Sequence, residues 1–306
     1  MKKKIIFALL ILLFIFTGSV LYPKLFAQQN PRGFTVTPSN VELQVKPGEI
    51  STQEIILTNA TNTDTEIKVI RRNFTAQGEE GQVSLTTEES SYSLASWLSV
   101  TPESIIVKKN SQEKFLITVK IPNNAEPGGH FGSVVFTTVP KKDLKQTGAV
   151  VSQEIASLFL VKIAGKVNED AKIVSFSTPK WFFEFGPVPF DIRVKNNSTV
   201  HIKPVGSITV EGSFGQKLTG SVDSRNILPG AIRKLQGILS DKLLIGKYTA
   251  SVSLFYGTQN NAPLVAQVTF YAFPVRLGLI ILAALIIIFI MRRRIFKALR
   301  IIIIGK

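Results

Sequence analysis

The middle of the chain alternates apolar and polar residues with the period of a β-strand. Val41–Val45 alternates and stops at Lys46-Pro-Gly48, and Phe115–Ile121 stops at Pro122. Because successive strand side chains point to opposite faces of a sheet, this pattern predicts strands with one buried face. Between Gln28 and Ala272 there is no long helical periodicity, so we predict an all-β fold. Further strands are predicted at Ile55–Leu57, Thr65–Ile70, Val134–Phe136, Ser157–Ile163, Lys172–Phe176, Phe190–Val194, Gly206–Glu211, Tyr248–Tyr256 and Val265–Phe270.

Two halves of this region carry a weak internal repeat. A strand that ends in Asn59-Ala-Thr61 matches one that ends in Asn196-Asn-Ser198, and Phe131 and Tyr248 follow glycine turns at matching places of a later strand. In immunoglobulin-like domains an aromatic residue near the start of a late strand packs or caps the corner there. We therefore predict two tandem immunoglobulin-like β-sandwiches, at residues 28–166 and 167–269.

The N-terminus has the form of an export signal. Lys2, Lys3 and Lys4 precede the uncharged run Ile5–Leu21, which is a positive segment followed by an apolar one. Residues 1–27 are either a signal peptide cleaved after Ala27 or an uncleaved signal anchor, since Leu25 is larger than the small residue that cleavage favours. Either way, the chain from Gln28 onward is expected outside the cytoplasm.

A second apolar run, Phe270–Met291, is interrupted only by Arg276. As a helix it would be ~33 Å long at ~1.5 Å per residue, enough for a hydrocarbon core of ~30 Å. The basic residues Arg292–Arg294 follow at once, and the positive-inside rule places the tail 292–306 in the cytoplasm. The sequence thus predicts a single-pass plasma-membrane protein with extracytoplasmic β domains, with residues 270–291 as its transmembrane helix.

The charge distribution argues against nucleic-acid binding. The formal net charge is +15. However, all 21 acidic residues and 25 of the 36 basic ones lie between Gln28 and Val275, so this region carries only +4 and the flanks +11. Basic residues beside apolar runs set membrane topology, whereas a nucleic-acid protein has a basic stripe on its folded domain.

No arrangement of residues suggests an enzyme. The chain has no cysteine, which excludes disulfides, cysteine nucleophiles and cysteine zinc sites. His130 and His201 stand alone, and there is no P-loop, Gly-x-Ser-x-Gly or His-Glu-x-x-His motif. Glu79-Glu80 and Glu88-Glu89 are interpreted as solvated loop residues rather than an acid–base pair. Asn168–Asp170 offers oxygen ligands for calcium, but too few to distinguish a site from a polar linker. We expect no catalytic residues, cofactor or metal.

The densest aromatic run, Trp181-Phe-Phe-Glu-Phe185, is a candidate partner-binding segment. In a strand Trp181, Phe183 and Phe185 would face one way and Phe182 the other. The run is interpreted as core on one face and inter-domain packing on the other, or alternatively as an exposed patch that docks a partner.

A second candidate is the basic stretch with Lys141, Lys142 and Lys145. It is interpreted as a hairpin tip, and loop tips on rigid sandwiches often carry binding residues. Such a tip could contact an anionic wall polymer, or it could simply be solvated.

The order of several turn and strand signals resembles a known family. These signals are Phe34–Pro38, Val45–Gly48, Leu57–Asn59, Thr118–Pro122, and Pro127–Gly129 with Val134–Phe136. Their order resembles the N-terminal domain of the WxL-interacting surface proteins, in which a second β-sandwich, a transmembrane helix and a basic tail follow. The resemblance implies a wall-associated scaffold, whose first domain is similar to one assigned peptidoglycan binding and whose second is similar to one assigned to host or surface partners. No ligand-contacting residue carries over from the family.

Three functions follow from these observations. The leading hypothesis is a non-catalytic scaffold that holds a cell-wall polymer such as peptidoglycan, or another surface protein, near the membrane. The alternative is a chaperone-like assembly factor that accepts a client strand at an open sheet edge. It would be distinguished by an unpaired edge without Lys or Pro protection, which the sequence does not locate. An enzyme assembled from scattered residues is the least favoured, and would need a pocket with converging polar groups.

Overall fold

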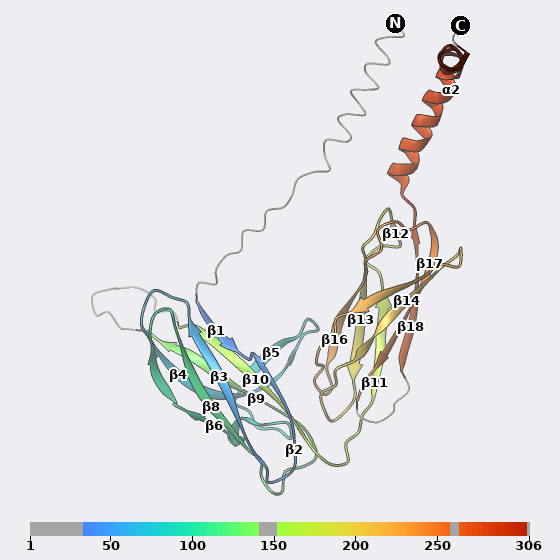
Figure 1. The fold of residues 1–306 in the computed structure, drawn as a ribbon. Helices are drawn as coiled ribbons and strands as arrows, with labels where there is room; N and C mark the ends of the chain where they lie inside the picture. Colours follow the sequence, from blue (N-terminus) through green and yellow to red (C-terminus); the bar gives the residue numbers. More distant parts are fainter. Residues whose placement is uncertain (1–32, 141–151, 258–262, 305–306) are drawn as a thin grey trace.

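The computed structural model describes residues 33–140, 152–257 and 263–304, and the expected all-β fold class is confirmed (Figure 1). Strands before residue 164 form an N-terminal unit, and those from residue 171 to 272 form a C-terminal unit. The first unit holds β1 (Phe34–Thr37), β2 (Asn40–Val45), β3 (Ile50–Asn59), β4 (Thr65–Gln77), β5 (Gln82–Thr86), β6 (Leu98–Thr101), β7 (Ser104–Val107), β8 (Ser111–Lys120), β9 (Gly128–Val139) and β10 (Glu154–Ile163), with a 3₁₀ turn at Ala95–Trp97. The second holds β11 (Ala171–Ser177), β12 (Phe182–Phe183), β13 (Val188–Asn196), β14 (Val205–Gly212), β15 (Lys217–Val222), β16 (Ile232–Leu239), β17 (Gly246–Phe255) and β18 (Leu264–Ala272).

The N-terminal unit is a sandwich of two sheets. One sheet has the order β1-β3-β8-β6, and the other has the order β2-β10-β9-β4-β5, with β7 also paired to β4. Alternating apolar residues of both sheets fill the space between them. Phe115 of β8 and Phe136 of β9 are fully buried there, with ring centroids 4.9 Å apart in an edge-on arrangement.

The C-terminal unit is built differently from the predicted sandwich of two sheets. Its eight strands form one hydrogen-bonded sheet in the order β11-β13-β16-β15-β14-β17-β18-β12. The sheet curls until β11 lies near β18, so the unit still encloses a core. Tyr248 and Phe270 stack at 5.4 Å in this core, and Phe190 packs against Phe270 at 6.0 Å.

The long helix α2 (Val275–Ile304) begins five residues later than the sequence predicted. Phe270 and Ala272, which we assigned to the membrane span, belong to β18 and are buried in the core. Alternation explains the difference, because Tyr271 between them is exposed as strand geometry requires. Val275–Arg292 is the one described helical segment long and apolar enough to cross a membrane. The predicted export segment, residues 1–27, lies outside the described residues.

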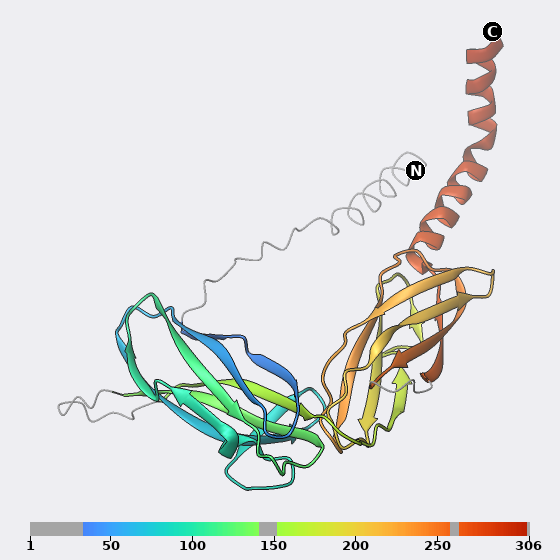
Figure 2. The same ribbon diagram turned by 60° about the horizontal axis from the view of Figure 1, so that its bottom comes forward.

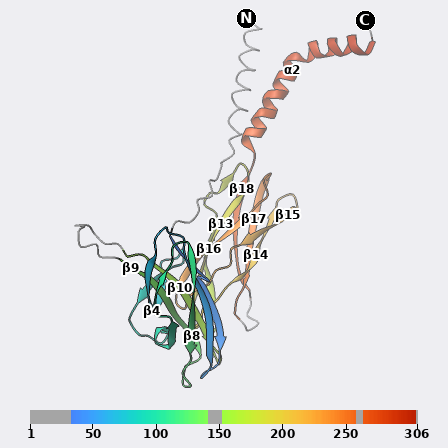
Figure 3. The same ribbon diagram turned by 60° about the vertical axis from the view of Figure 1, so that its left-hand side comes forward.

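The two units meet end to end at an angle, as Figures 1 and 2 show. β10 ends at Ile163 and β11 begins at Ala171, so a short connection joins them. The hairpin formed by β4 and β5 reaches from the N-terminal unit to the C-terminal one. Helix α2 leaves the C-terminal unit at the end opposite this junction, a relation that is also visible in Figure 3.

Candidate functional site

The N-terminal unit has an open seam where β1 and β10 lie next to one another in different sheets. The chain crosses between the sheets at Pro38 and Ser39, so β2 covers β10 only from Leu158 to Ile163. Glu154–Ser157, the first four residues of β10, pair with β9 on one side and with no strand of the described chain on the other. β1 likewise pairs only with β3 among the described strands. We call this gap between two free edges the β1–β10 seam.

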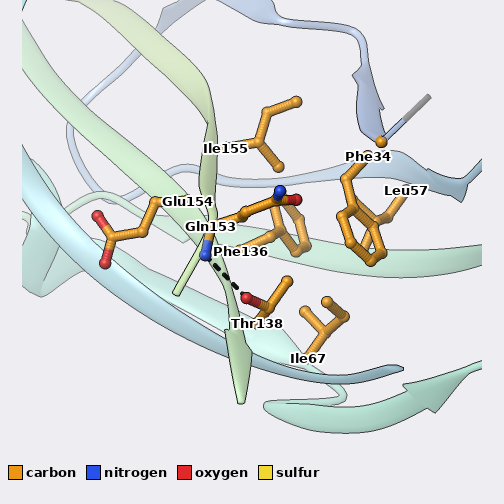
Figure 4. A pocket seen from close by; sticks show the side chains of 9 residues that line it. Phe34, Leu57, Ile67, Phe136, Thr138, Gln153, Glu154 and Ile155 are labelled. Carbon is orange, nitrogen blue, oxygen red and sulfur yellow. Dashed lines mark hydrogen bonds between the residues drawn. The ribbon is translucent and has the colours of Figure 1, made fainter. Parts of the chain in front are cut away.

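A cavity of about 370 Å³ opens in the seam (Figure 4). Its apolar lining comes from both sheets, and Thr138, Gln153 and Glu154 add polar groups; the apolar residues are Phe34, Leu57, Ile67, Phe136 and Ile155. Three of these, Leu57, Ile67 and Phe136, also belong to the buried core of the unit. A side chain that enters the cavity would therefore contact the core directly. The volume is at the low end of the ~300–1,000 Å³ typical of ligand pockets.

The rim of the cavity is held by the last hydrogen bonds of the β9–β10 hairpin. The Thr138 N–H donates to the Gln153 carbonyl at 3.0 Å, and the Gln153 N–H donates to Thr138 Oγ1 at 2.8 Å (Figure 4). Ser152 Oγ donates to the Thr138 carbonyl at 2.8 Å. These bonds fix the backbone where β10 begins, so the edge at Glu154 is already in strand geometry.

The backbone N–H and C=O groups of Glu154 and Ala156 point away from β9, into the seam. The Leu158 N–H donates to the Ser39 carbonyl at 2.9 Å, which sets the side of β10 that faces β2. Because N–H and C=O groups alternate in direction along a strand, Glu154 and Ala156 direct theirs to the same side, beyond the point where β2 ends. This edge therefore offers donors and acceptors beside an apolar cavity.

On the β10 side, the seam lacks the residues that usually protect an edge, whereas β1 across the seam is four residues long and is followed by Pro38. The four residues Glu154–Ser157 include no Lys or Pro, and proteins blunt exposed edges with such residues, with bulges or with very short strands. Three other described edges have such protection, whereas the edge strands β2 and β5 also contain neither Lys nor Pro. β6 is four residues long and is followed by Pro102, β11 has Lys172 and a register shift after Ile173, and β12 has two residues.

The β4–β5 turn connects the two units through charged residues. The Glu79 carboxylate accepts two hydrogen bonds from Arg193, the Nε one at 2.6 Å, and the Glu79 carbonyl accepts the Lys234 N–H at 2.8 Å. Lys234 Nζ lies 3.7 Å from Glu80 and 3.3 Å from Asp191. Arg193 lowers the pKa of the Glu79 carboxyl, chiefly through its hydrogen bonds. Glu80 is exposed and Glu79 partly exposed in this turn, and both residues also contact the C-terminal unit, which the sequence did not predict.

His201 and Phe131 lie at the same junction. Their rings meet edge-on at 5.8 Å, and the Gly129 N–H donates to the Thr199 carbonyl at 3.0 Å. Burial lowers the pKa of His201, an effect that Glu42 opposes. Phe131, which is expected to pack or cap at a corner of its own unit, packs against Phe74 at 5.9 Å and Tyr92 at 6.1 Å there, and it also contacts the neighbouring unit through His201.

The other lone histidine and the candidate calcium ligands are held by protein groups. The His130 ring nitrogens lie 3.2 Å from the Ser93 carbonyl and 3.3 Å from the Glu126 carbonyl. Glu169 pairs with Lys162 at 2.8 Å, and Asp170 accepts a hydrogen bond from Asn197 at 2.9 Å. Within the described ranges no group of three or more His, Asp or Glu side chains could hold a metal ion.

The aromatic run at Trp181–Phe185 does not present one face. β12 has only two residues, so strand alternation does not extend across the run. Phe183 is buried and packs edge-on against Phe270 at 5.8 Å, while Trp181 and Phe185 are exposed. The run lies beside the start of α2 rather than at the junction of the units, so it does not provide inter-domain packing. Lys141, Lys142 and Lys145 lie outside the described residues.

No family model and no curated protein matches this sequence. Among solved structures, the class 5 fimbriae chaperone CfaA is 15% identical over 77% of this chain and 98% of its own, with a TM-score of 0.41. The E. coli chaperone DraB is 13% identical over 78% and 97%, with a TM-score of 0.35. The CsuC–CsuE chaperone–adhesion subunit complex of Acinetobacter baumannii gives 10% identity over 78% and 99%, with a TM-score of 0.36. Values this low say nothing about function.

The prediction that the chain resembles the WxL-interacting surface proteins as a member of that family is wrong. No family model matches the chain. The motifs behind the resemblance are turn and strand signals that many β-sandwiches need. Gly48, for example, has a φ of 81° at the turn after β2, a conformation that favours glycine in any protein.

Proposed function

We propose that this chain is a non-catalytic, membrane-tethered binding protein that holds an extended segment of another surface protein in the β1–β10 seam. The observation that carries the proposal is an unpaired, unprotected strand edge directly beside a cavity that reaches the core. This is the alternative that the sequence left open, a chaperone-like factor that accepts a strand from a client.

Strand addition accounts for both parts of the seam. Main-chain hydrogen bonds to an exposed edge give affinity, and pockets for alternate side chains give specificity. A segment beside Glu154–Ser157 would take the place that β2 leaves before Asn40. Its backbone would pair with Glu154 and Ala156, and every second side chain would point toward Phe34 and Ile155 at the cavity wall.

The same geometry indicates the chemistry of the bound segment. The cavity has an apolar lining, so the inward side chains should be aliphatic or aromatic. The exposed Glu154 carboxylate at the rim disfavours an acidic residue opposite it and favours Lys or Arg. The preferred client segment is thus a short extended stretch that alternates apolar and polar residues.

Helix α2 supplies the tether in this proposal. It follows β18 after only Phe273 and Pro274, and the segment Val275–Arg292 has the length and apolar character of a membrane span. The seam would then lie in the unit farther from the membrane, where a client arriving from outside the cell could enter it.

Site-specific photo-crosslinking tests the proposal in the full chain. A photoreactive amino acid would replace Gln153, which lines the cavity and is exposed. The matched control is Gln44, an exposed glutamine on β2 beside the other end of β10. Irradiation of membranes from producing cells should give a discrete adduct with another extracytoplasmic protein at position 153 and not at 44.

Three outcomes contradict the proposal. Equal adducts at both positions would mean nonspecific contact with the surface. An adduct that glycan digestion removes would indicate a wall polymer. A crosslink within the chain itself would mean that its own residues occupy the seam.

A further inference from the structure

One end of the C-terminal unit gathers the loops that surround the start of α2. Strand register places these loops together, because Gly212 pairs with Tyr248 and Gly246 pairs with Ala272, the last residue of β18. We call this the helix-side end. It comprises the loops at Lys180–Gly186, Ser213–Gln216 and Ser240–Ile245 with the Phe273–Pro274 link, and Figure 1 shows β12 beside the base of α2.

The helix-side end exposes large apolar side chains. Trp181 is 74% exposed, Phe214 is 73% exposed and Leu243 is 60% exposed. The described C-terminal unit and its link to α2 have six strongly exposed aromatic residues, and five of them are at this end. These five are Trp181, Phe185, Phe214, Tyr271 and Phe273, with Phe255 at the opposite end. A concentration of exposed apolar groups marks an interaction surface.

The loop Lys180–Gly186 is hydrogen-bonded to the end of β18 and to the link after it, and it forms an ion pair with the first turn of α2. The Tyr271 N–H donates to the Trp181 carbonyl at 2.9 Å, and the Phe273 N–H donates to the Phe183 carbonyl at 3.0 Å. Arg276 Nε, in the first turn of α2, lies 3.2 Å from the Glu184 carboxylate. The loop and the first turn of the helix are therefore held together, and the position of the helix along the membrane normal determines the depth of Trp181.

The apolar part of α2 is only just long enough to cross the membrane, so no linker can hold the C-terminal unit away from the bilayer. Helix α2 continues to Ile304, but Arg292–Arg294 end its apolar part, so the segment Val275–Met291 has 17 residues and extends ~26 Å at ~1.5 Å per residue. A hydrocarbon core is ~30 Å thick, and the headgroup regions extend the bilayer to ~40–45 Å. The span thus needs all of its residues, and Val275 lies at the hydrocarbon boundary. β18 ends only three residues earlier, so the helix-side end lies at the depth of the headgroups.

The residue types at this end suit that environment. Trp and Tyr are enriched at membrane–water interfaces, and Lys residues near the surface are attracted to anionic lipids. Lys180, Lys242 and Lys247 are exposed at the same end. The acidic residues there are Asp241, Glu184 and Glu211, of which Glu184 pairs with Arg276 and Glu211 with Lys217.

We propose that the helix-side end is a second membrane contact, with Trp181, Phe185 and Phe214 inserted among the lipid headgroups of the bilayer that α2 spans. This inference rests on the membrane span in the proposed function, and it is independent of what the seam binds. The C-terminal unit then rests on the membrane surface in a fixed orientation instead of moving freely on its helix.

The two tryptophans of the chain provide a direct test with an internal control. In the Trp97→Phe variant Trp181 is the only tryptophan, and in Trp181→Phe only Trp97 of the N-terminal unit remains. The full chain would be reconstituted in phosphatidylcholine–phosphatidylglycerol vesicles with and without bromine on the lipids near the headgroup. We expect brominated lipid to lower Trp181 emission about twofold and to leave Trp97 emission unchanged. If Trp97→Phe does not fold, the difference between the unsubstituted chain and Trp181→Phe gives the same signal.

Flotation of the vesicles separates the two levels of the proposal. If the chain floats but brominated lipid does not quench Trp181, the membrane span is retained and the second membrane contact is contradicted. This holds whether water, a second copy of the chain or another protein covers the tryptophan. A chain that does not float with the vesicles overturns the membrane span and the second contact together. Quenching of Trp97 to the same extent as Trp181 would also contradict the assignment.

Discussion

Asn59 and Asn196 occupy equivalent places in the two β units and make equivalent hydrogen bonds. Both side chains are fully buried at the end of a strand. Asn59 Oδ1 accepts the Thr61 N–H at 2.9 Å, and Asn196 Oδ1 accepts the Ser198 N–H at 2.8 Å. The weak repeat noticed in the sequence therefore marks one structural device used twice.

The amide nitrogens of the two residues complete the correspondence. Asn59 Nδ2 donates to Thr63, four residues later, at 2.9 Å, and Asn196 Nδ2 donates to Val200 at 2.8 Å, both to carbonyl oxygens. Each also donates to a carbonyl of a segment distant in sequence, Val107 at 3.2 Å and Ile227 at 2.8 Å. Each asparagine thus ties its own turn to a neighbouring segment of its unit.

Removing either asparagine should destabilise the unit that contains it. Asn59→Ala and Asn196→Ala would each leave several buried donors and acceptors without partners, at an expected cost of about 2–4 kcal/mol. The control is Asn197→Ala, which removes an exposed hydrogen bond to Asp170 and should cost under about 0.5 kcal/mol. Urea unfolding of the full chain in detergent measures all three. Equal midpoints for Asn196→Ala and Asn197→Ala would contradict this role.

The ion pair between Glu79 and Arg193 should control the angle between the two units more than the stability of either unit. Glu79→Ala removes the contacts with Arg193, which is only partly shielded from water, so the unfolding midpoint should change little. We expect Glu79→Ala to broaden the distribution of distances between two spin labels. The labels would be attached to single cysteines introduced at Ser99 and Ser207, one in each unit.

Glu54→Ala is the matched control for the junction, since Glu54 pairs with Lys114 inside the N-terminal unit at 3.0 Å. It should leave the label distance unchanged. A distribution that is equally narrow in both variants would show that the other contacts at the junction suffice to fix the angle.

Stability should fall as the pH decreases through the range in which histidine titrates. Burial lowers the pKa of His201 below its ordinary value of about 6.5, so the unfolded chain binds a proton more readily than the folded one. The contribution is fully present above that value and is lost as the pH falls from about 6.5 toward the folded pKa. Thermal unfolding at pH 7.5 and 5.5 should show the loss, and His201→Phe should reduce it. The Glu79 carboxyl, whose pKa is also lowered, titrates below this window. An unchanged loss in His201→Phe would exclude His201 as its source.

Most long strands could be predicted because one face of each is buried and the other is not. β2, β8, β13 and β17 show this alternation plainly in their burial. β16 was missed because Arg233-Lys234 interrupts its apolar pattern. These residues face the other unit, where Lys234 meets Glu79 and Glu80. A contact between units leaves no periodic signal in either segment.

The seam could not be predicted for a related reason. It depends on where β2 begins to pair with β10, at Asn40 opposite Leu158, which is a matter of register between segments more than 100 residues apart. The sequence did supply the criterion, an edge without Lys or Pro. Only the fold shows that Glu154–Ser157 meets it and that a cavity lies beside it.

The most direct test of the central claim is a proline at Ala156. Ala156 directs its N–H away from β9, so Ala156→Pro should keep the β9 pairing, as edge prolines generally do, while blocking a strand that adds to β10. Ala156→Val, which keeps the N–H, is the control. With the photoreactive residue at position 153, we expect proline to abolish the client adduct, valine to retain it, and both variants to unfold at similar temperatures. An adduct of equal yield in the folded proline variant would contradict binding by strand addition.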